Sequence, residues 1–187
     1  MEWTLATRKA FRAGLFGLAL WSVFGMGQAM AQVWDAFDAG ADSRWDYVAD
    51  GVMGGVSEGG AVLEDGAIAL RGQVSTANNG GFIQVRRRFE GGWPEQTEGL
   101  RLTVRGNGET YYVFLRITGL TRVWHSYRAS FTAGADWTEI SLPFAEFTPS
   151  HAGMAPRFTP DQVISIGLVA YGRDHEAELM VREIGLY

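Results

Sequence analysis

Hydrophobic and polar residues alternate with a period of two along most of the chain after residue 60. The run over residues 100–105 reads LRLTVR, and the same alternation recurs over residues 111–118, 124–131, 138–142, 164–170 and 176–187. Alternation of this kind places successive side chains on opposite faces of a β-strand. No amphipathic segment of helical period exceeds about two turns. Short strands separated by Gly, Asp and Pro therefore predict an all-β protein, a sandwich or a barrel.

Two connections stand out in this pattern. The turn signal Gly106-Asn107-Gly108 separates the strand predicted over 100–105 from the strand predicted over 111–118, which predicts that the two form a hairpin. The proline-rich segment 143–160 is expected to be a long ordered crossover connection, followed by a short helix over 159–163.

The alternation also predicts one polar and aromatic sheet face. If Leu100, Val113 and Tyr127 point into the core, the intervening side chains point the other way. These side chains are Arg101, Arg105, Tyr112, Phe114, Arg116, Trp124 and Arg128. Aromatic rings can stack on sugars, and arginine can donate hydrogen bonds to hydroxyl or carboxylate groups. The same face would also suit a protein partner, or its Arg–aromatic pairs could simply stabilise the sheet.

The first 31 residues have the pattern of a secretory signal peptide. Arg8, Lys9 and Arg12 precede an uncharged, mostly apolar run over 13–27, and Ala29-Met30-Ala31 provides a small-x-small cleavage site. The apolar run has about 15 residues, fewer than the roughly 20 that a membrane-spanning helix needs. We therefore expect cleavage before Gln32, no stable membrane anchor afterwards, and a periplasmic or secreted protein. Residues 32–187 would form one domain.

Composition narrows the chemistry that this domain could perform. The chain has no cysteine, which excludes thiol catalysis and thiolate metal sites. Removing residues 1–31 takes three residues from the 16 basic ones and one from the 21 acidic ones, leaving a net charge of −7. This acidic balance, without any basic run, argues against nucleic acid as a partner.

A glycine-rich stretch over residues 50–60 reads DGVMGGVSEGG. It contains a G-x-S-x-G sequence centred on Ser57, the pattern of a hydrolase nucleophile, and His125, His151 and His175 could serve as bases. However, Ser57 is followed by Gly59-Gly60 and a strand-like segment, whereas a nucleophile elbow leads into a helix. A phosphate-binding loop would need a lysine, and Lys9 is the only one. We therefore expect Ser57 to be structural.

Acidic residues near this stretch raise two further possibilities. They are Asp46, Asp50, Glu58, Glu64 and Asp65, and they could bind calcium or form a glycosidase carboxylate pair. Their spacing matches no known calcium loop, and such residues commonly cap backbone N–H groups in turns. We predict no metal, no cofactor and no catalytic residue.

Several motifs in sequence order resemble the complex I intermediate-associated protein 30 family. After Trp45 they are DGVMGGVS over 50–57, NNGGF over 78–82, Tyr127 and Phe131 in one short motif, Trp137, Pro143-Phe144 with Phe147, and the segment 164–168. The resemblance covers roughly residues 37–187.

This resemblance implies a jelly-roll β-sandwich of the galactose-binding-like group. It also implies that two loop motifs are structural and pack against each other, with Met53 and Phe82 as apolar plugs. The motif residues are Asp50, Gly51, Met53, Gly54, Gly55, Ser57, Asn79, Gly80, Gly81 and Phe82. The family brings no catalytic residues to carry over.

The eukaryotic member of this family is a mitochondrial assembly factor that binds intermediates of respiratory complex I. An exported protein would face the wrong side of the membrane for that role. We therefore expect a non-enzymatic, exported binding domain with a protein partner, in an assembly or chaperone-like role. The alternative is a carbohydrate-binding module that holds a polysaccharide on the aromatic and arginine face.

Overall fold

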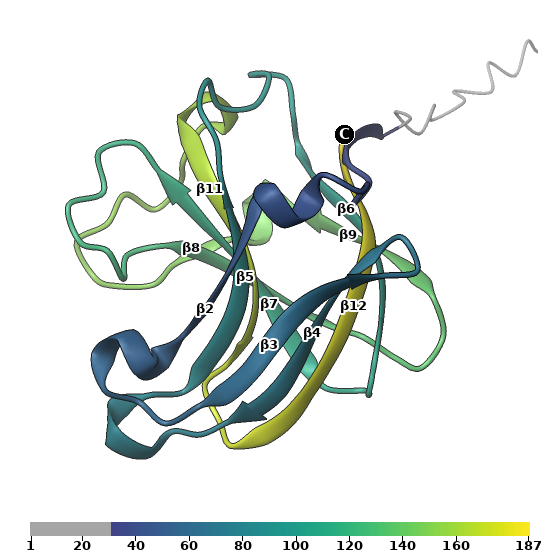
Figure 1. Ribbon diagram of the computed structural model, residues 1–187. Coiled ribbons are helices and arrows are strands. Elements are labelled where there is room, and N and C mark those ends of the chain that lie inside the picture. Colours follow the sequence, from purple (N-terminus) through teal and green to yellow (C-terminus); the bar gives the residue numbers. More distant parts are fainter. Residues whose placement is uncertain (1–30) are drawn as a thin grey trace, which may run out of the picture.

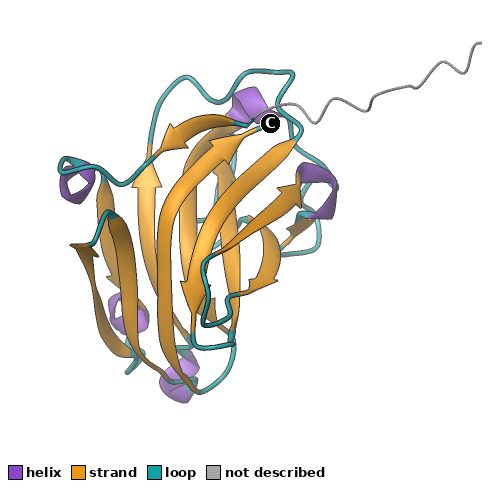
Figure 2. Ribbon diagram, turned by 90° about the vertical axis from the view of Figure 1, so that its right-hand side faces the viewer, coloured by secondary structure: helices purple, strands orange, loops and turns teal. Residues whose placement is uncertain are grey.

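The computed structural model describes residues 31–187, which form two antiparallel β-sheets packed face to face (Figures 1 and 2). The predicted signal peptide lies outside the described residues, apart from Ala31. Within the described part, no helix has the length and hydrophobicity that crossing a membrane requires. The prediction of an all-β jelly-roll sandwich is confirmed.

Sheet A has the strand order β3-β4-β12-β6-β9, and β1 also pairs with β12. Its strands are β1 (Gln32–Asp35), β3 (Glu58–Glu64), β4 (Ala67–Val74), β6 (Gly99–Gly106), β9 (Thr138–Pro143) and β12 (His175–Leu186). The long strand β12 lies in the middle, with β4 and β1 along one edge and β6 along the other.

Sheet B has the strand order β10-β8-β7-β11-β5-β2. Its strands are β2 (Trp45–Ala49), β5 (Phe82–Arg88), β7 (Thr110–Ile117), β8 (Tyr127–Thr132), β10 (Thr148–Pro149) and β11 (Val163–Tyr171). The short helices are 3-10 turns: η1 (Ala41–Ser43), η2 (Asp50–Met53), η3 (Ala77–Asn79), η4 (Phe144–Glu146) and η5 (Pro160–Gln162).

The core lies between the sheets and consists of the inward half of each alternating strand. Leu100, Leu102 and Val104 of β6 are fully buried, as are Val113 and Leu115 of β7. Because the period is two, burying one set of side chains turns their neighbours outward. The alternation read from the sequence therefore located the core correctly.

The predicted hairpin between residues 100–105 and 111–118 is wrong. β6 pairs with β12 and β9 in sheet A, whereas β7 pairs with β8 and β11 in sheet B. The turn at Gly106–Gly108 crosses from one sheet to the other. Asn107 secures this corner, because its side chain donates to the carbonyl of Glu176 and accepts a hydrogen bond from the Tyr111 hydroxyl, over 2.9 and 2.7 Å.

The segment 143–160 is a long connection, as expected, and contains η4 and β10. The pairing of Thr148 and Pro149 with β8 brings this connection to the outer edge of sheet B. It is followed by η5, close to the short helix expected over 159–163. The connection also supplies His151 to the face described next.

Candidate binding site

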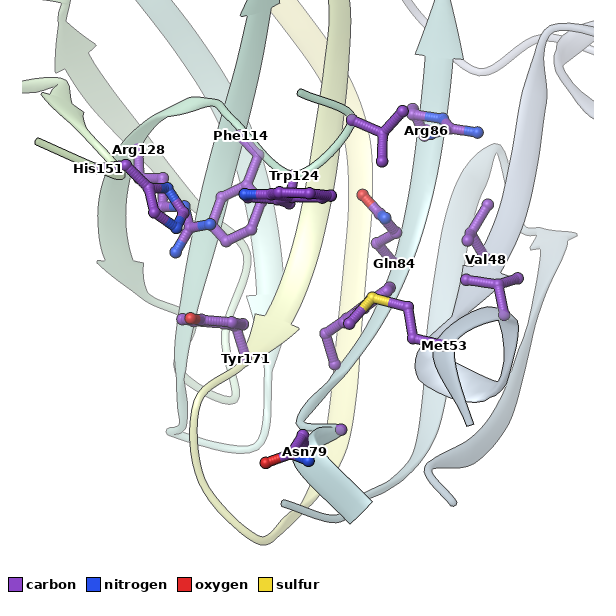
Figure 3. A pocket seen from close by; sticks show the side chains of 14 residues that line it. Val48, Met53, Asn79, Gln84, Arg86, Phe114, Trp124, Arg128, His151 and Tyr171 are labelled. Atoms are coloured by element: carbon purple, nitrogen blue, oxygen red, sulfur yellow. The ribbon is translucent and has the colours of Figure 1, made fainter. Parts of the chain in front are cut away.

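A hollow of about 500 Å³ lies on the outward face of sheet B, and we call it the sheet B hollow. Its lining comes from β2, η2, η3, β5, β7, β8, β11, the β7–β8 loop and the 143–160 connection. The lining residues are Val48, Val52, Met53, Asn79, Gly80, Phe82, Gln84, Arg86, Phe114, Val123, Trp124, Arg128, His151 and Tyr171. In Figure 3, Arg128 and His151 lie on one side, Val48 and Met53 on the other, and Gln84 between them.

A glycine at the centre of sheet B shapes the floor. Gly167 of β11 pairs with Phe114 of β7 and with Arg86 of β5, so its position faces outward. The Gln84 side chain lies over it, and a Cβ at position 167 would come within 2.8 Å of the Gln84 Oε1. A larger residue there would therefore displace Gln84 and raise the floor.

Trp124 projects over the hollow from the loop between β7 and β8 (Figure 3). The structure places it in this loop, whereas the sequence had predicted it on a strand. Its side chain is 51 % exposed. The Arg116 Nη1 donates to the backbone carbonyls of Arg122, Val123 and His125. Arg116 thus fixes the loop that carries Trp124.

Arg128 lies on the opposite side of the hollow from Arg86. Its guanidinium lies 4.3 Å from the ring centroid of Phe114 and 4.9 Å from that of Tyr171. Its Nε donates to the Ser126 hydroxyl over 3.0 Å. Stacking and this hydrogen bond fix the guanidinium, and the other N–H groups remain available as donors.

Asp50 joins the two glycine-rich loops at the lower rim. Its side chain is fully buried and accepts hydrogen bonds from the Ser57 backbone and hydroxyl and from the backbone N–H groups of Gly81 and Phe82. A Cβ at Gly55 or Gly80 would come within 2.4 Å of this carboxylate. The glycines are therefore required because both loops close tightly around one carboxylate.

Burial alone would raise the pKa of Asp50, but the hydrogen bonds from Ser57, Gly81 and Phe82 outweigh it and hold the pKa below its usual value. The carboxylate thus stays ionised and anchors η2 and η3, which carry the rim residues Met53 and Asn79.

This geometry bears on the earlier candidates for chemistry. The Ser57 hydroxyl is buried, donates to Asp50 and accepts the Ser75 N–H over 2.9 Å, and none of the described histidines bonds to it. Asp50 uses its oxygens on these N–H and O–H donors. Within residues 31–187, no three His, Asp or Glu side chains are close enough together to hold a metal ion.

The predicted role of Met53 as an apolar plug is wrong, because its side chain is 61 % exposed at the rim of the hollow. Phe82, predicted as the second plug, is half-buried and also lines the hollow. η2 ends at Met53 and is followed by Gly54, which has a φ of +90°.

The structure brings five of the seven predicted face residues to the outward side of sheet B. Tyr112, Phe114, Arg116 and Arg128 lie on β7 and β8, and Trp124 on the loop between them. The prediction was wrong for Arg101 and Arg105, which lie on β6, on the outward face of sheet A. Period two gave their direction correctly, but β6 belongs to the other sheet.

Four lining residues were not predicted from the sequence: Gln84, Arg86 and Tyr171 on strands, and His151 in the crossover connection. Gln84 and Arg86 belong to the alternating run FIQVRRR over 82–88, which begins at the end of the NNGGF motif. That alternation could have identified this strand and its polar face. No sequence signal links His151 to the hollow, because the pairing of β10 with β8 places it there.

A family model described as complex I intermediate-associated protein 30 (CIA30) matches residues 36–181. The chain belongs to this family. The match covers all of sheet B, which lines the hollow, and sheet A apart from β1 and the end of β12. Comparison with curated proteins finds no match.

Solved structures share the fold of this CIA30 family member. The family 11 carbohydrate-binding module of cellulosomal cellulase Lic26A-Cel5E of Clostridium thermocellum is 15 % identical, with a TM-score of 0.70 over 83 % of this chain and 93 % of that chain. The Clostridium thermocellum module in complex with a β-1,3-1,4-mixed-linked tetrasaccharide gives 15 % identity and a TM-score of 0.69, over 83 % and 94 % of the two chains. An agarase structure is 9 % identical, with a TM-score of 0.58 over 83 % of this chain and 24 % of that chain.

Proposed function

We propose that this CIA30 domain is a non-catalytic carbohydrate-binding domain that holds a polysaccharide in the sheet B hollow. The observation that carries the proposal is a half-exposed tryptophan, Trp124, over a floor that also offers the Gln84 amide and the guanidinium groups of Arg86 and Arg128. Aromatic rings pack on the apolar faces of sugars, and amide and guanidinium groups hydrogen-bond to hydroxyl groups.

The size of the hollow supports the proposal. About 500 Å³ lies within the range of small-molecule sites, which is about 300 to 1,000 Å³, and a few polar groups on an apolar lining are typical of such sites. The likeness in fold to a module solved with a mixed-linked tetrasaccharide is consistent with this function.

A protein partner is the second candidate function, and one observation favours it. Val52, Met53 and Val123 at the rim are 76 %, 61 % and 80 % exposed. Exposed apolar side chains around a hollow are common where a protein binds. The family description also points to a protein partner.

Affinity electrophoresis of the purified protein in gels containing mixed-linked β-glucan, agarose or homogalacturonan tests the first proposal. We expect at least one polysaccharide to retard the protein. Trp124→Ala should weaken that binding by about 2 kcal/mol, the scale of a central aromatic anchor, or about 30-fold. Trp137→Ala, on the outward face of sheet A, is the matched control and should bind normally.

The outcome that contradicts carbohydrate binding is equally clear. Carbohydrate binding would be contradicted if none of the polysaccharides retarded the protein, while it captured a cell-envelope protein through a contact that Trp124→Ala abolishes. That result would establish the second candidate function instead.

We also propose that the domain works outside the cytoplasm after removal of residues 1–31. The basic, apolar and Ala-x-Ala succession supports this. Mass spectrometry of the protein recovered from the producing cell should find Gln32 at its N-terminus. An intact Met1 in a cytoplasmic fraction would contradict export.

A further inference from the structure

The charges around the sheet B hollow differ from those of the chain as a whole. The chain has 16 basic and 21 acidic residues, yet the lining contains Arg86, Arg128 and His151 and no aspartate or glutamate. An acidic protein with a binding face that carries only basic groups attracts ligands of negative charge.

The two arginines of the lining also lack acidic partners. Five other arginines form ion pairs with carboxylates: Arg44, Arg71, Arg87, Arg101 and Arg173. No described carboxylate comes within 4.0 Å of Arg86 or Arg128. Asp46 pairs with Arg86 across the β2–β5 ladder, but its exposed side chain does not reach ion-pair distance. Neither guanidinium of the hollow therefore has an ion-pair partner among the described residues.

Arg86 carries the clearest sign of a missing acceptor. Its Nε is buried and has no hydrogen-bond partner among the described residues. Burial lowers the pKa of Arg86, and the positive charges of Arg88 and Arg116 lower it further. The negative charge of Asp46 has the opposite effect. The guanidinium stays charged, because arginine does not lose its proton in proteins. A buried donor without an acceptor costs free energy. The partly desolvated cation beside the hollow would be stabilised by an anionic ligand placed there.

The two guanidinium groups are spaced along the sheet. Arg86 lies on β5 and Arg128 on β8, and β11 and β7 separate them. Three strand spacings correspond to about 14 Å. Trp124, Gln84 and Tyr171 line the hollow along this path. A chain of sugars lying across the strands would present its charged groups to both arginines.

We propose that the sheet B hollow selects acidic polysaccharides, whose sugar rings carry carboxylate groups, over neutral ones. This inference rests on the proposed carbohydrate-binding function and names the substrate class of that same site. Guanidinium groups bind carboxylates through paired, charge-assisted hydrogen bonds, which hydroxyl groups of a neutral sugar cannot match.

Isothermal titration calorimetry with two forms of one ligand tests the selection. De-esterified homogalacturonan oligosaccharides carry carboxylates, and fully methyl-esterified oligosaccharides of the same length have the same backbone without the charges. We expect the de-esterified form to bind at least about tenfold more tightly at low ionic strength, and added NaCl to reduce this difference.

Variants locate the effect. Arg86→Gln and Arg128→Gln should each reduce the preference for the charged form several-fold, and thermal melts check that both variants are folded. Arg105→Gln on the outward face of sheet A removes the same charge and should keep the full preference. A preference that survives both hollow variants would overturn the inference.

The remaining outcomes separate this inference from the proposed function. Equal binding of the two forms, or binding of mixed-linked β-glucan alone, would overturn acidic selection and leave carbohydrate binding in place. Binding of a poly-glutamate peptide without binding of any oligosaccharide would overturn both, and would show that the arginines serve an acidic protein segment.

Discussion

The outward face of sheet A carries a tryptophan among arginines, as the outward face of sheet B does. On sheet A, the guanidinium groups of Arg105 and Arg182 lie 5.0 and 4.9 Å from the ring centroid of Trp137. This ring also packs against Ala67, Ala69 and Met180. Elsewhere in the same sheet, two arginines form ion pairs, Arg71 with Glu64 and Arg101 with Glu139.

On sheet B, the tryptophan stands apart from the strands. Trp124 is half exposed, and the guanidinium nearest to it is that of Arg122 in its own loop, at 5.7 Å. Arg86 and Arg128 have no carboxylate within ion-pair distance in the described chain. Tryptophan and arginine thus contact one another or carboxylates on the outward face of sheet A. On the outward face of sheet B, Trp124 is exposed and two arginines have no ion-pair partner within residues 31–187. Composition and alternation do not distinguish these states, because the partners come from neighbouring strands and loops.

The largest effect is expected at the junction around Asp50, which builds the rim of the sheet B hollow. The Asp50 carboxylate accepts four hydrogen bonds. In Asp50→Asn one carboxylate oxygen becomes an NH₂ group, which cannot accept from the donors that face it. We expect the free energy of unfolding to fall by about 2 to 4 kcal/mol in urea titrations. Ser57→Ala, which removes one donor to Asp50 and the acceptor of the Ser75 N–H, should cost about 1 to 2 kcal/mol.

The same carboxylate predicts a pH dependence. The pKa of Asp50 in the folded state lies below its usual value of 3.8, so its contribution is complete above about pH 4 and is lost as the pH falls through the folded pKa. Wild type and Asp50→Asn should therefore become more alike in stability on acidification. A difference in unfolding free energy that stays constant with pH would contradict the anchoring role.

The two tryptophans offer the most direct comparison of the faces. Trp137→Ala removes a ring held between two guanidinium groups and should lower the free energy of unfolding by about 1 to 2 kcal/mol. Trp124→Ala should change the melting temperature little, because its side chain is half exposed. Thermal melts of the two variants measure this, and equal losses would show that Trp124 is a structural residue.

Arg116 should influence the hollow through the Trp124 loop. Arg116→Met removes the donors that hold three loop carbonyls, and we expect a loss of about 1 kcal/mol in the stability of the loop. Trypsin should then cleave after Arg122 faster than in the wild type, as followed by mass spectrometry. Arg105→Met on sheet A is the control and should leave the cleavage rate unchanged. An unchanged rate at Arg122 in the Arg116→Met variant would argue against this role.

The smallest effect is expected at the floor of the hollow. Gly167→Ala places a methyl group where the Gln84 Oε1 now lies, and this flexible side chain can move. We expect less than about 1 kcal/mol of change in stability, but several-fold weaker polysaccharide binding, because the Gln84 amide is displaced. Gly134→Ala, at a position with open space around it, should change neither quantity.

Much of the fold could be predicted from the sequence, because each strand with one buried face shows its period directly. β6, β7, β8, β9, β11 and β12 fall within or close to the alternating runs. Their partners could not be predicted, because alternation fixes the direction of a side chain and not the neighbouring strand. The corner at Asn107 therefore passed for a hairpin, and Arg101 and Arg105 were assigned to the wrong sheet.

The candidate site was predictable only where it follows strands. Phe114 and Arg128 came from the alternation, whereas the placement of Trp124 depends on the contacts that Arg116 makes with loop carbonyls. The glycine motif was recognisable in the sequence, but the reason why glycine is required there was not. That reason is the buried Asp50, whose close contacts at Gly55 and Gly80 are formed by segments about 25 residues apart in the chain.

The order in which the strands occur has a consequence for how the protein folds. β11 pairs with both β5 and β7, and β12 pairs with β4, β6 and β1, so the last two strands in the sequence join the halves of their sheets. Pairing over such long sequence distances is slow, because the intervening chain must first be ordered. Until residue 186 has been synthesised, the earlier strands keep open edges. Neither sheet can therefore close before β11 and β12 have been added.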